Sequence, residues 1–454
     1  MKIIFVSMDT MRADRLGCLG NRRALTPTLD RFAGEGALFE RAFATDIPTQ
    51  PSHTALFTGR FGVNTGVVSH FLPSTSLAEN EPWLPSILRQ KGLRSAAVDH
   101  LFSMKGWFER GYDEYMPPPG RSRAPASVIN DLAFPWIEAH ADEEFFLFLH
   151  YWDAHIPYVP PDEFRKYSAS SQSSVDPLVR QRLRSRPTYP LFKHNLYDHL
   201  GEIPSVDYIA DLYDDEIAYL DYELGRLADH LSELGILDDT MLVFFGDHGE
   251  NMDEHDAWFD HAGLYDSVVH VPLIIWRPGL VPPSRVSPMV ALVDVMPTTL
   301  ELLGYDVPGG LDGRSLVPLL EGTTTRHRDE LVLCEATWQA KRAIRTEEWK
   351  LIRCYDPGVF LRSETELYHL GKDPNERENV ADAHPDVVRA LEGRLDRWLD
   401  AQLGSQVDPV ALAVAEGLPA VARLDRVIEG SERGNAPERT AVENGHLVAA
   451  TASS

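Results

Sequence analysis

Two apolar runs of the sequence are each followed by residues that bind cations. Asp9 follows residues 3–7, and the pair Asp247 and His248 follows residues 241–245. If both runs are parallel strands of one sheet, their carboxyl ends meet at the same edge, where open α/β sheets place their sites. Taken alone, an aspartate after a strand is more often a cap or a turn residue. Two carboxylates and an imidazole together, however, are suitable ligands for a divalent cation.

A third chemically competent segment begins at Thr49 and continues through Pro51 and Ser52. The Pro-Ser pair is expected to begin a helix, and the free amides of a helix N-terminus can stabilise an oxyanion. Thr49 is therefore either a simple cap of this helix or a hydroxyl nucleophile beside the cation.

The elements that must position these residues alternate between short apolar runs and helical patterns. This alternation predicts an α/β fold, with a central, mostly parallel sheet flanked by helices. The expected strands are residues 3–7, 94–98, 145–150, 241–245 and 272–276. One helix should begin after a Thr26 cap, and another should run through residues 213–234 and end at Gly235.

The pattern changes from about Arg326. Short strands at 330–334, 341–346, 349–354 and 365–369 predict a smaller C-terminal antiparallel sheet, followed by a helix over 385–403. We therefore divide the chain into a catalytic α/β domain (1–325), an antiparallel subdomain (326–404), and a helical arm with a flexible tail (405–454). A helix is expected within 408–428, and the last ~20 residues are expected to be loosely ordered.

Composition restricts the kinds of partner that the chain is expected to bind. The net charge of −26 disfavours nucleic acid and anionic membranes but not a small anionic ester substrate, because a bound cation inverts the local field. No run reaches the ~20 apolar residues of a membrane span, and the first residues lack a signal-peptide cleavage site, so a cytoplasmic location is expected. The C-terminal tail is a candidate for homo-oligomer contacts. An arginine-rich stretch at 180–186 is either a solvated loop or a lid.

The segment from Thr49 to Arg60 resembles the signature of the sulfatase branch of the alkaline phosphatase superfamily. Further segments resemble that family in the same order, at 8–14, 151–158, 245–250 with 261–266, 294–298, 312–316 and 366–370. The resemblance covers residues 1 to about 400, and its ordered motifs are far more specific than any one of them.

The resemblance departs from ordinary sulfatases at Thr49, where they carry the Cys or Ser that becomes formylglycine. Threonine cannot form that aldehyde, although hydroxyl nucleophiles attack phosphorus in other branches of the superfamily. Thr10 follows Asp9 where sulfatases usually have a second Asp and phosphonate monoester hydrolases have a polar residue. The resemblance thus implies a metal-dependent hydrolase of phosphate or phosphonate mono- or diesters that uses Thr49. The alternatives are a sulfatase-like sulfuric ester hydrolase, a phosphotransferase and a non-catalytic binding protein.

The resemblance also implies the cation's ligands, which would be Asp9, Asp247 and His248 together with Thr49. An imidazole ligand favours zinc or manganese, and calcium is possible.

The remaining site residues are histidines. His155 and His261 are expected to be catalytic, touching the transferred group or protonating the leaving group, although sulfatases usually have Lys at the His261 position. Three others either bind substrate or are ordinary core or surface residues, namely His53, His70 and His100. A second metal, held by Asp153 and the two catalytic histidines, stays open.

Overall fold

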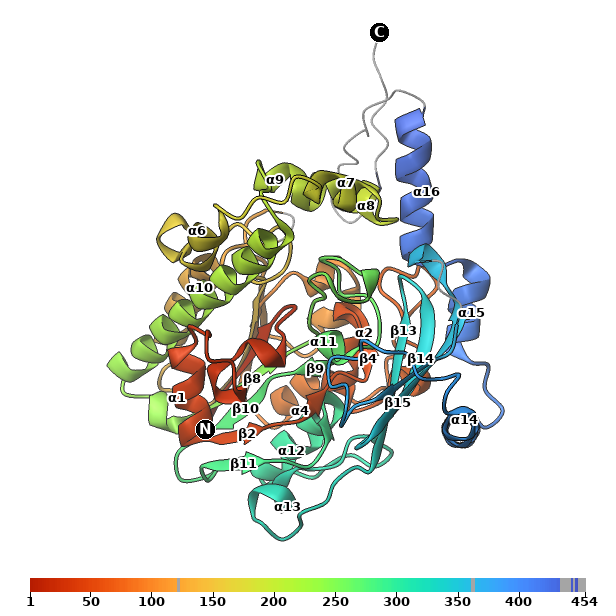
Figure 1. Ribbon diagram of the computed structural model, residues 1–454. Helices are drawn as coiled ribbons and strands as arrows, with labels where there is room; N and C mark the ends of the chain where they lie inside the picture. Colours follow the sequence, from red (N-terminus) through yellow and green to blue (C-terminus); the bar gives the residue numbers. More distant parts are fainter. Residues whose placement is uncertain (121–122, 361–363, 433–441, 444–445, 448–454) are drawn as a thin grey trace.

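The computed structural model describes residues 1–120, 123–360, 364–432, 442–443 and 446–447. A large central sheet lies between two layers of helices, and a smaller sheet packs at one side, as Figure 1 shows. The predicted α/β class is confirmed, including its separate antiparallel sheet. No helix in these described ranges is long and apolar enough to cross a membrane.

The central sheet has eight strands in the order β11-β2-β10-β8-β1-β7-β5-β6. The first strand, β1 (Lys2–Met8), lies between β7 (Phe145–Tyr151) and β8 (Thr240–Gly246) and is parallel to both. Parallel pairing continues through β5 (Arg94–Val98) to β6 (Glu114–Met116). The carboxyl ends of β1, β7 and β8 therefore meet at one edge, as the sequence predicts.

The strand expected at 272–276 does form, as β10 (Leu273–Trp276), but it runs antiparallel to β8. The chain between them contains short helices, among them α11 (Asp266–Val269), and a two-residue strand, but no long crossover that returns it to the opposite edge of the sheet. A parallel partner needs such a crossover, so β10 pairs in the opposite direction. The sheet ends with β2 (Ala37–Phe39) and β11 (Ser284–Val286).

The two faces of the sheet carry separate apolar cores. Ile4 and Val6 of β1 face one core, whereas Ile3 and Phe5 face the other, as the alternation of a strand requires. The first core is covered by α1 (Pro27–Glu35), α5 (Ala126–Ala139) and α10 (Val206–Glu233). The second is covered by α2 (Thr49–Thr58), α4 (Leu84–Gln90) and α12 (Val295–Leu302).

Helix α10 begins earlier than its predicted start at residue 213. Ser205 caps it by accepting a hydrogen bond from the Tyr208 amide (3.2 Å), and Gly235 follows its end in the left-handed conformation. Thr26 occupies the cap position of α1 as predicted, but its side chain does not cap the helix. Asp221 of α10 accepts from two amides at the start of α1 instead, both at 2.9 Å.

The smaller sheet contains β13 (Glu330–Ala336), β14 (Ala340–Thr346), β15 (Trp349–Asp356) and β16 (Glu366–His369). Helix α14 (Pro385–Leu403) packs against it, with the predicted bounds. A short strand, β4 (Asp46–Ile47), joins the sheet parallel to β13. The segment just before Thr49 is thus fixed by the C-terminal part of the chain. The boundary proposed near residue 325 stays a prediction.

The arm consists of two helices instead of one. Asp408 caps α15 (Pro409–Glu416) and forms an ion pair with Arg342. Gly417 separates it from α16 (Pro419–Glu432), which packs against α8 (Tyr189–Phe192) and stands above β13 in the view of Figure 1. Most of the tail expected to be loosely ordered lies outside the described residues. Shorter elements are β3 (Ala42–Phe43), β9 (His270–Val271), β12 (Val290–Ala291), α3 (Gly62–Thr65), α6 (Tyr167–Ser171), α7 (Val179–Arg184), α9 (Asp198–Leu200) and α13 (Val317–Leu320).

Candidate active site

Asp9, Asp247 and His248 come together at the carboxyl edge of the central sheet. Asp9 directly follows β1, the other two directly follow β8, and all three are fully buried. Their ligand atoms lie within 4.8 Å of one another. His248 Nε2 is 3.4 Å from Asp247 Oδ2 and 4.0 Å from Asp9 Oδ1. The parallel pairing of β1 and β8 therefore produces the grouping expected from the sequence.

One oxygen of each carboxylate has no hydrogen-bond partner. Asp247 Oδ1 accepts from the amides of Thr10 (3.2 Å) and His248 (2.9 Å), but Asp247 Oδ2 and Asp9 Oδ1 are buried and accept from nothing. Buried carboxylate oxygens without a partner cost several kcal/mol unless a cation binds them. The donor set and these oxygens fit a divalent cation.

His150, which the sequence reading did not select, joins this centre. Its Nε2 is 3.2 Å from Asp9 Oδ2, and its Nδ1 is 2.7 Å from Asp99 Oδ1. Burial acts to lower the pKa of His150, but the hydrogen bonds to Asp9 and Asp99 outweigh it and raise the pKa to about 10. His150 stands near the end of β7, beside β1, so the rule that selects Asp9 would also have selected it.

The charges at this edge do not balance. Asp9, Asp99 and Asp247 supply three negative charges when ionised, and protonated His150 supplies one positive charge. With His248 neutral, as a ligand of a cation must be, two negative charges remain in a fully buried environment, and a divalent cation would neutralise them.

Thr49 is the first residue of α2 and is almost completely buried. Its Oγ1 lies 3.1 Å from His248 Nε2. His248 Nδ1 donates to the Gly249 carbonyl (3.0 Å), so the Nε2 lone pair faces Thr49 and the carboxylates. Ser52 ties the same helix to β8 by donating to the Asp247 carbonyl at 2.6 Å. Thr49 thus sits where a hydroxyl nucleophile is expected.

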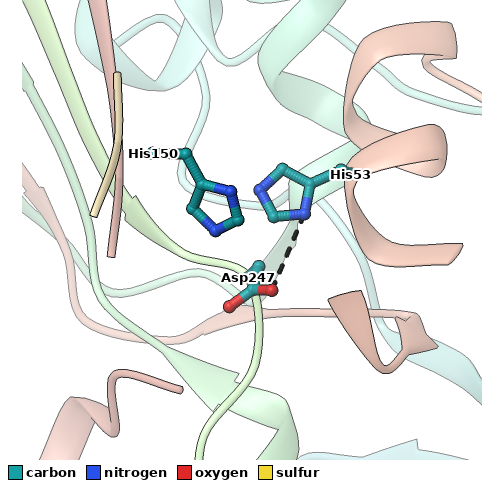
Figure 2. Close-up of side chains that lie close together, drawn as sticks. All are labelled: His53, His150 and Asp247. Carbon is teal, nitrogen blue, oxygen red and sulfur yellow. Dashed lines mark ion pairs between the residues drawn. The ribbon is translucent and has the colours of Figure 1, made fainter. Parts of the chain in front are cut away.

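His53 belongs to the same helix, one turn after Thr49, and is not on the wall of the cavity above Thr49. Its Nδ1 donates to the Thr49 carbonyl, its Nε2 accepts from Ser7 Oγ, and both distances are 2.8 Å. Figure 2 shows its ring beside that of His150, with Nδ1 directed toward Asp247 and 3.6 Å from Asp247 Oδ2. Burial is the main cause that lowers the pKa of His53 to about 4. The geometry fits a neutral positioning residue better than the substrate-binding role predicted for it.

A cavity of about 610 Å³ opens above Thr49. Three of the predicted histidines line it, namely His70, His155 and His261. The ring of His261 lies 4.7 Å from that of His248 and 5.5 Å from that of His155. The apolar walls of the cavity include Trp152, Phe192 and Trp338. His100 follows Asp99 behind the centre and is not among the lining residues, so its predicted contact with substrate has no support in this geometry.

Without substrate, burial favours the neutral form of the two predicted catalytic histidines. Burial, followed by the charge of His248, lowers the pKa of His261 to about 3. Burial and Arg123 hold the pKa of His155 well below its usual range. Asp153 joins no group of three ligand atoms within 4.8 Å among the described residues. The three ligands considered for a second metal therefore do not form such a group; they are Asp153, His155 and His261.

Comparison with known proteins decides the family. A model of the Sulfatase family matches residues 2–305, and one described as N-sulphoglucosamine sulphohydrolase, C-terminal, matches residues 253–401. The chain belongs to the sulfatase family. This family member is 24% identical over 472 residues to N-acetylglucosamine-6-O-sulfatase of Bacteroides thetaiotaomicron, covering 83% of this chain and 82% of that protein. It is 34% identical over 191 residues to arylsulfatase K of Danio rerio, covering 40% of this chain but only 36% of that relative.

Solved structures of other proteins share the sulfatase fold. A protein determined in complex with D-glucosamine-2-N,6-O-disulfate aligns with a TM-score of 0.72 at 20% identity, over 90% of this chain and 99% of that one. The phosphonate monoester hydrolase of Agrobacterium radiobacter aligns with a TM-score of 0.71 at 22% identity, over 88% of this chain and 95% of that one. The two sequence relatives described above are named sulfatases, whereas both solved structures, the phosphonate hydrolase included, show the fold alone. The comparisons thus favour the sulfuric ester alternative over the phosphorus ester that the sequence reading placed first.

Proposed function

We propose that this sulfatase-family chain hydrolyses sulfuric esters, with Thr49 as the attacking group. The observation that carries the proposal is the 3.1 Å separation of Thr49 Oγ1 and His248 Nε2 at the floor of a cavity, beside two carboxylates. Asp9, Asp247 and His248 would hold a divalent cation, which would neutralise the ester's charge and favour the ionised Thr49 hydroxyl. The imidazole ligand favours zinc or manganese, and calcium also suits the carboxylates.

The steps of bond formation and proton transfer are assigned to residues of the chain. Thr49 Oγ1 forms a bond to sulfur while the bond from sulfur to the leaving oxygen breaks, and the hydroxyl proton passes to solvent. The leaving oxygen takes a proton from His261 or His155. Water then attacks the sulfur, the bond from sulfur to Thr49 Oγ1 breaks and sulfate leaves, while one proton of the water returns to Thr49 and the other restores the histidine. Because an anion raises the pKa of nearby imidazoles, a bound substrate would oppose the lowering that burial causes at both histidines.

Hydrolysis of a phosphate or phosphonate ester is the second candidate, and Thr49 itself favours it. A formylglycine hydrate releases sulfate by reforming its aldehyde, but a sulfated threonine has no such exit. Its ester must be cleaved by a second attack at sulfur. A phosphorylated hydroxyl is released by that same kind of in-line attack, which needs no aldehyde. The chemistry of Thr49 therefore suits phosphorus at least as well as sulfur.

Matched aryl esters separate these candidates. We would measure kcat/KM for 4-nitrophenyl sulfate, 4-nitrophenyl phosphate, bis(4-nitrophenyl) phosphate and 4-nitrophenyl phenylphosphonate, each with calcium, manganese or zinc. The expected result is the highest efficiency on the sulfate, lost in Thr49→Ala. Highest efficiency on a phosphorus ester would replace the first candidate with the second. Transfer to an added alcohol would identify a transferase, and no turnover of any ester would leave only a binding protein.

A further inference from the structure

Three arginines line the outer part of the cavity above Thr49. They are Arg123, which is half-buried, and Arg423 and Arg426, which are exposed on α16. Among the described residues, none of their side chains forms an ion pair, although most other arginines near carboxylates do. Burial lowers the pKa of Arg123 to about 10, so it stays charged at neutral pH while partly removed from water. A chain with a net charge of −26 thus gathers unpaired cations at one cavity.

The sequence of α16 explains why two of them face inward. Pro419, Arg423 and Arg426 are spaced by three or four residues, so they share one face of the helix and line the cavity. Leu424 and Val427 lie on another face and pack against the apolar core. The helix is therefore held by its apolar side while its two arginines line the cavity.

Within the described part of the chain, no carboxylate of the cavity wall forms an ion pair with these arginines. Glu416 also lines the cavity, but its carboxylate accepts hydrogen bonds from the amide (3.2 Å) and the hydroxyl of Ser74. The cavity is also lined by the indoles of Trp152 and Trp338 and the ring of Phe192, which offer flat, apolar walls. The cavity thus combines a reactive floor, room for a ring and a cationic mouth.

We infer that Arg123, Arg423 and Arg426 form a subsite for a second anionic group, carried by the leaving-group part of the substrate. The preferred substrates would be ring-shaped esters with a further carboxylate, sulfate or phosphate remote from the reacting ester. Arginine binds such groups through paired, charge-assisted hydrogen bonds. The inference rests on the proposed function only in placing the reacting ester at Thr49. Both family matches end by residue 401, so α16 lies beyond them.

Binding of inert probes tests the subsite without any turnover. In the full chain carrying Thr49→Ala, calorimetry would compare naphthalene-2-sulfonate with naphthalene-2,6-disulfonate, with and without added calcium, manganese or zinc. We expect the dianion to bind about tenfold more tightly, the size of one charge-assisted interaction. The double change Arg423→Gln and Arg426→Gln should remove that advantage. The probe 6-sulfo-2-naphthoate shows whether a carboxylate is accepted as well as a sulfonate.

Arg180→Gln is the matched control, because Arg180 is an exposed arginine on the neighbouring α7 that does not line the cavity. It should keep the full preference for the dianion. Any of three results would overturn the inference. These are equal affinities of the two probes for the Thr49→Ala chain, a preference for the dianion that survives the double change, and no binding of either probe under any condition. Failure of every ester assay would count against the proposed hydrolase alone, because these probes report binding and not hydrolysis. Thermal melting of each variant confirms that it is folded.

Discussion

The hydroxyl of Thr49 is the group on which the chemistry depends, and its substitution gives the sharpest test at the scale of single residues. Thr49→Ser keeps a hydroxyl beside His248 Nε2, whereas Thr49→Ala removes it. We expect the serine variant to retain turnover within about tenfold and the alanine variant to lose about a thousandfold or more, as for loss of an activated nucleophile. Initial rates on the best aryl ester measure both. An alanine variant as active as the parent would exclude Thr49 as the nucleophile.

His150 is expected to act through Asp9 without touching substrate. His150→Gln removes the imidazolium group that bridges Asp9 and Asp99, so Asp9 loses the partner that orients it. Outer partners of metal ligands typically contribute 10- to 100-fold in metal affinity, and we expect a loss of about tenfold. Metal titration of the chelator-treated protein would measure it. His194→Gln, at an exposed histidine paired with Asp198, should leave the affinity unchanged. Equal affinities in both variants would contradict the role.

At the scale of elements, α10 positions the loop that carries Asp9. The Tyr213 hydroxyl donates to the Thr10 carbonyl (2.7 Å) and accepts from the Arg12 amide (3.1 Å). Tyr213→Phe leaves both buried groups short of a partner, which should lower the free energy of unfolding by about 1–3 kcal/mol and lower kcat. Urea unfolding and steady-state rates measure the two effects. Tyr222→Phe, at an exposed tyrosine of the same helix, should change neither. A Tyr213 variant that matches it would refute the positioning role.

Asp294 joins the start of α12 to the segment that precedes the smaller sheet. Burial acts to raise the pKa of Asp294, but Arg328 and His327 outweigh it and lower the pKa from 3.8 to about 2. A carboxyl with a lowered folded pKa stabilises the fold above its unfolded pKa, and the effect is lost as the pH falls through the folded value. Asp294→Asn should therefore cost about 2 kcal/mol or more at pH 7.

This cost should shrink as the pH falls from about 4 toward 2. Urea unfolding of the parent and the variant at several pH values measures the difference. Asp306→Asn, at an exposed carboxylate, provides the baseline. A cost for Asp294→Asn that does not change with pH would show that the ion pairs with Arg328 and His327 are not its cause.

At the scale of the whole molecule, the arm completes the cavity from the far end of the chain. Ending the chain after Gly417 removes α16 and keeps α15, which the ion pair of Asp408 with Arg342 holds to the sheet. We expect KM for aryl esters to rise severalfold, because one wall of the cavity is lost. Unchanged KM would exclude α16 from the substrate site. Light scattering on the same samples tests the predicted oligomer, since a fall in particle mass beyond the deleted residues would support it.

The sequence by itself determined the features that depend on neighbouring residues. Periodicity and strand length predicted most of the central strands and α14, because alternation and helical spacing are local properties. Strand ends and ordered motifs placed Asp9, Asp247 and His248 together, because parallel strands share one carboxyl edge. The same reasoning brought Thr49 to that edge through its helix N-terminus.

Only the tertiary structure decided the contacts between segments far apart in the chain. It joined His150 to Asp9 and Asp99, reversed β10, and used Asp221 to cap a helix almost two hundred residues earlier. It also placed the side chain of His53 away from the cavity and made α16 part of the cavity wall. No local sequence pattern encodes these pairings, because each residue fits its own helix, strand or loop equally well with a different partner. Burial of both apolar faces, together with hydrogen bonding of most buried polar groups, selects among them.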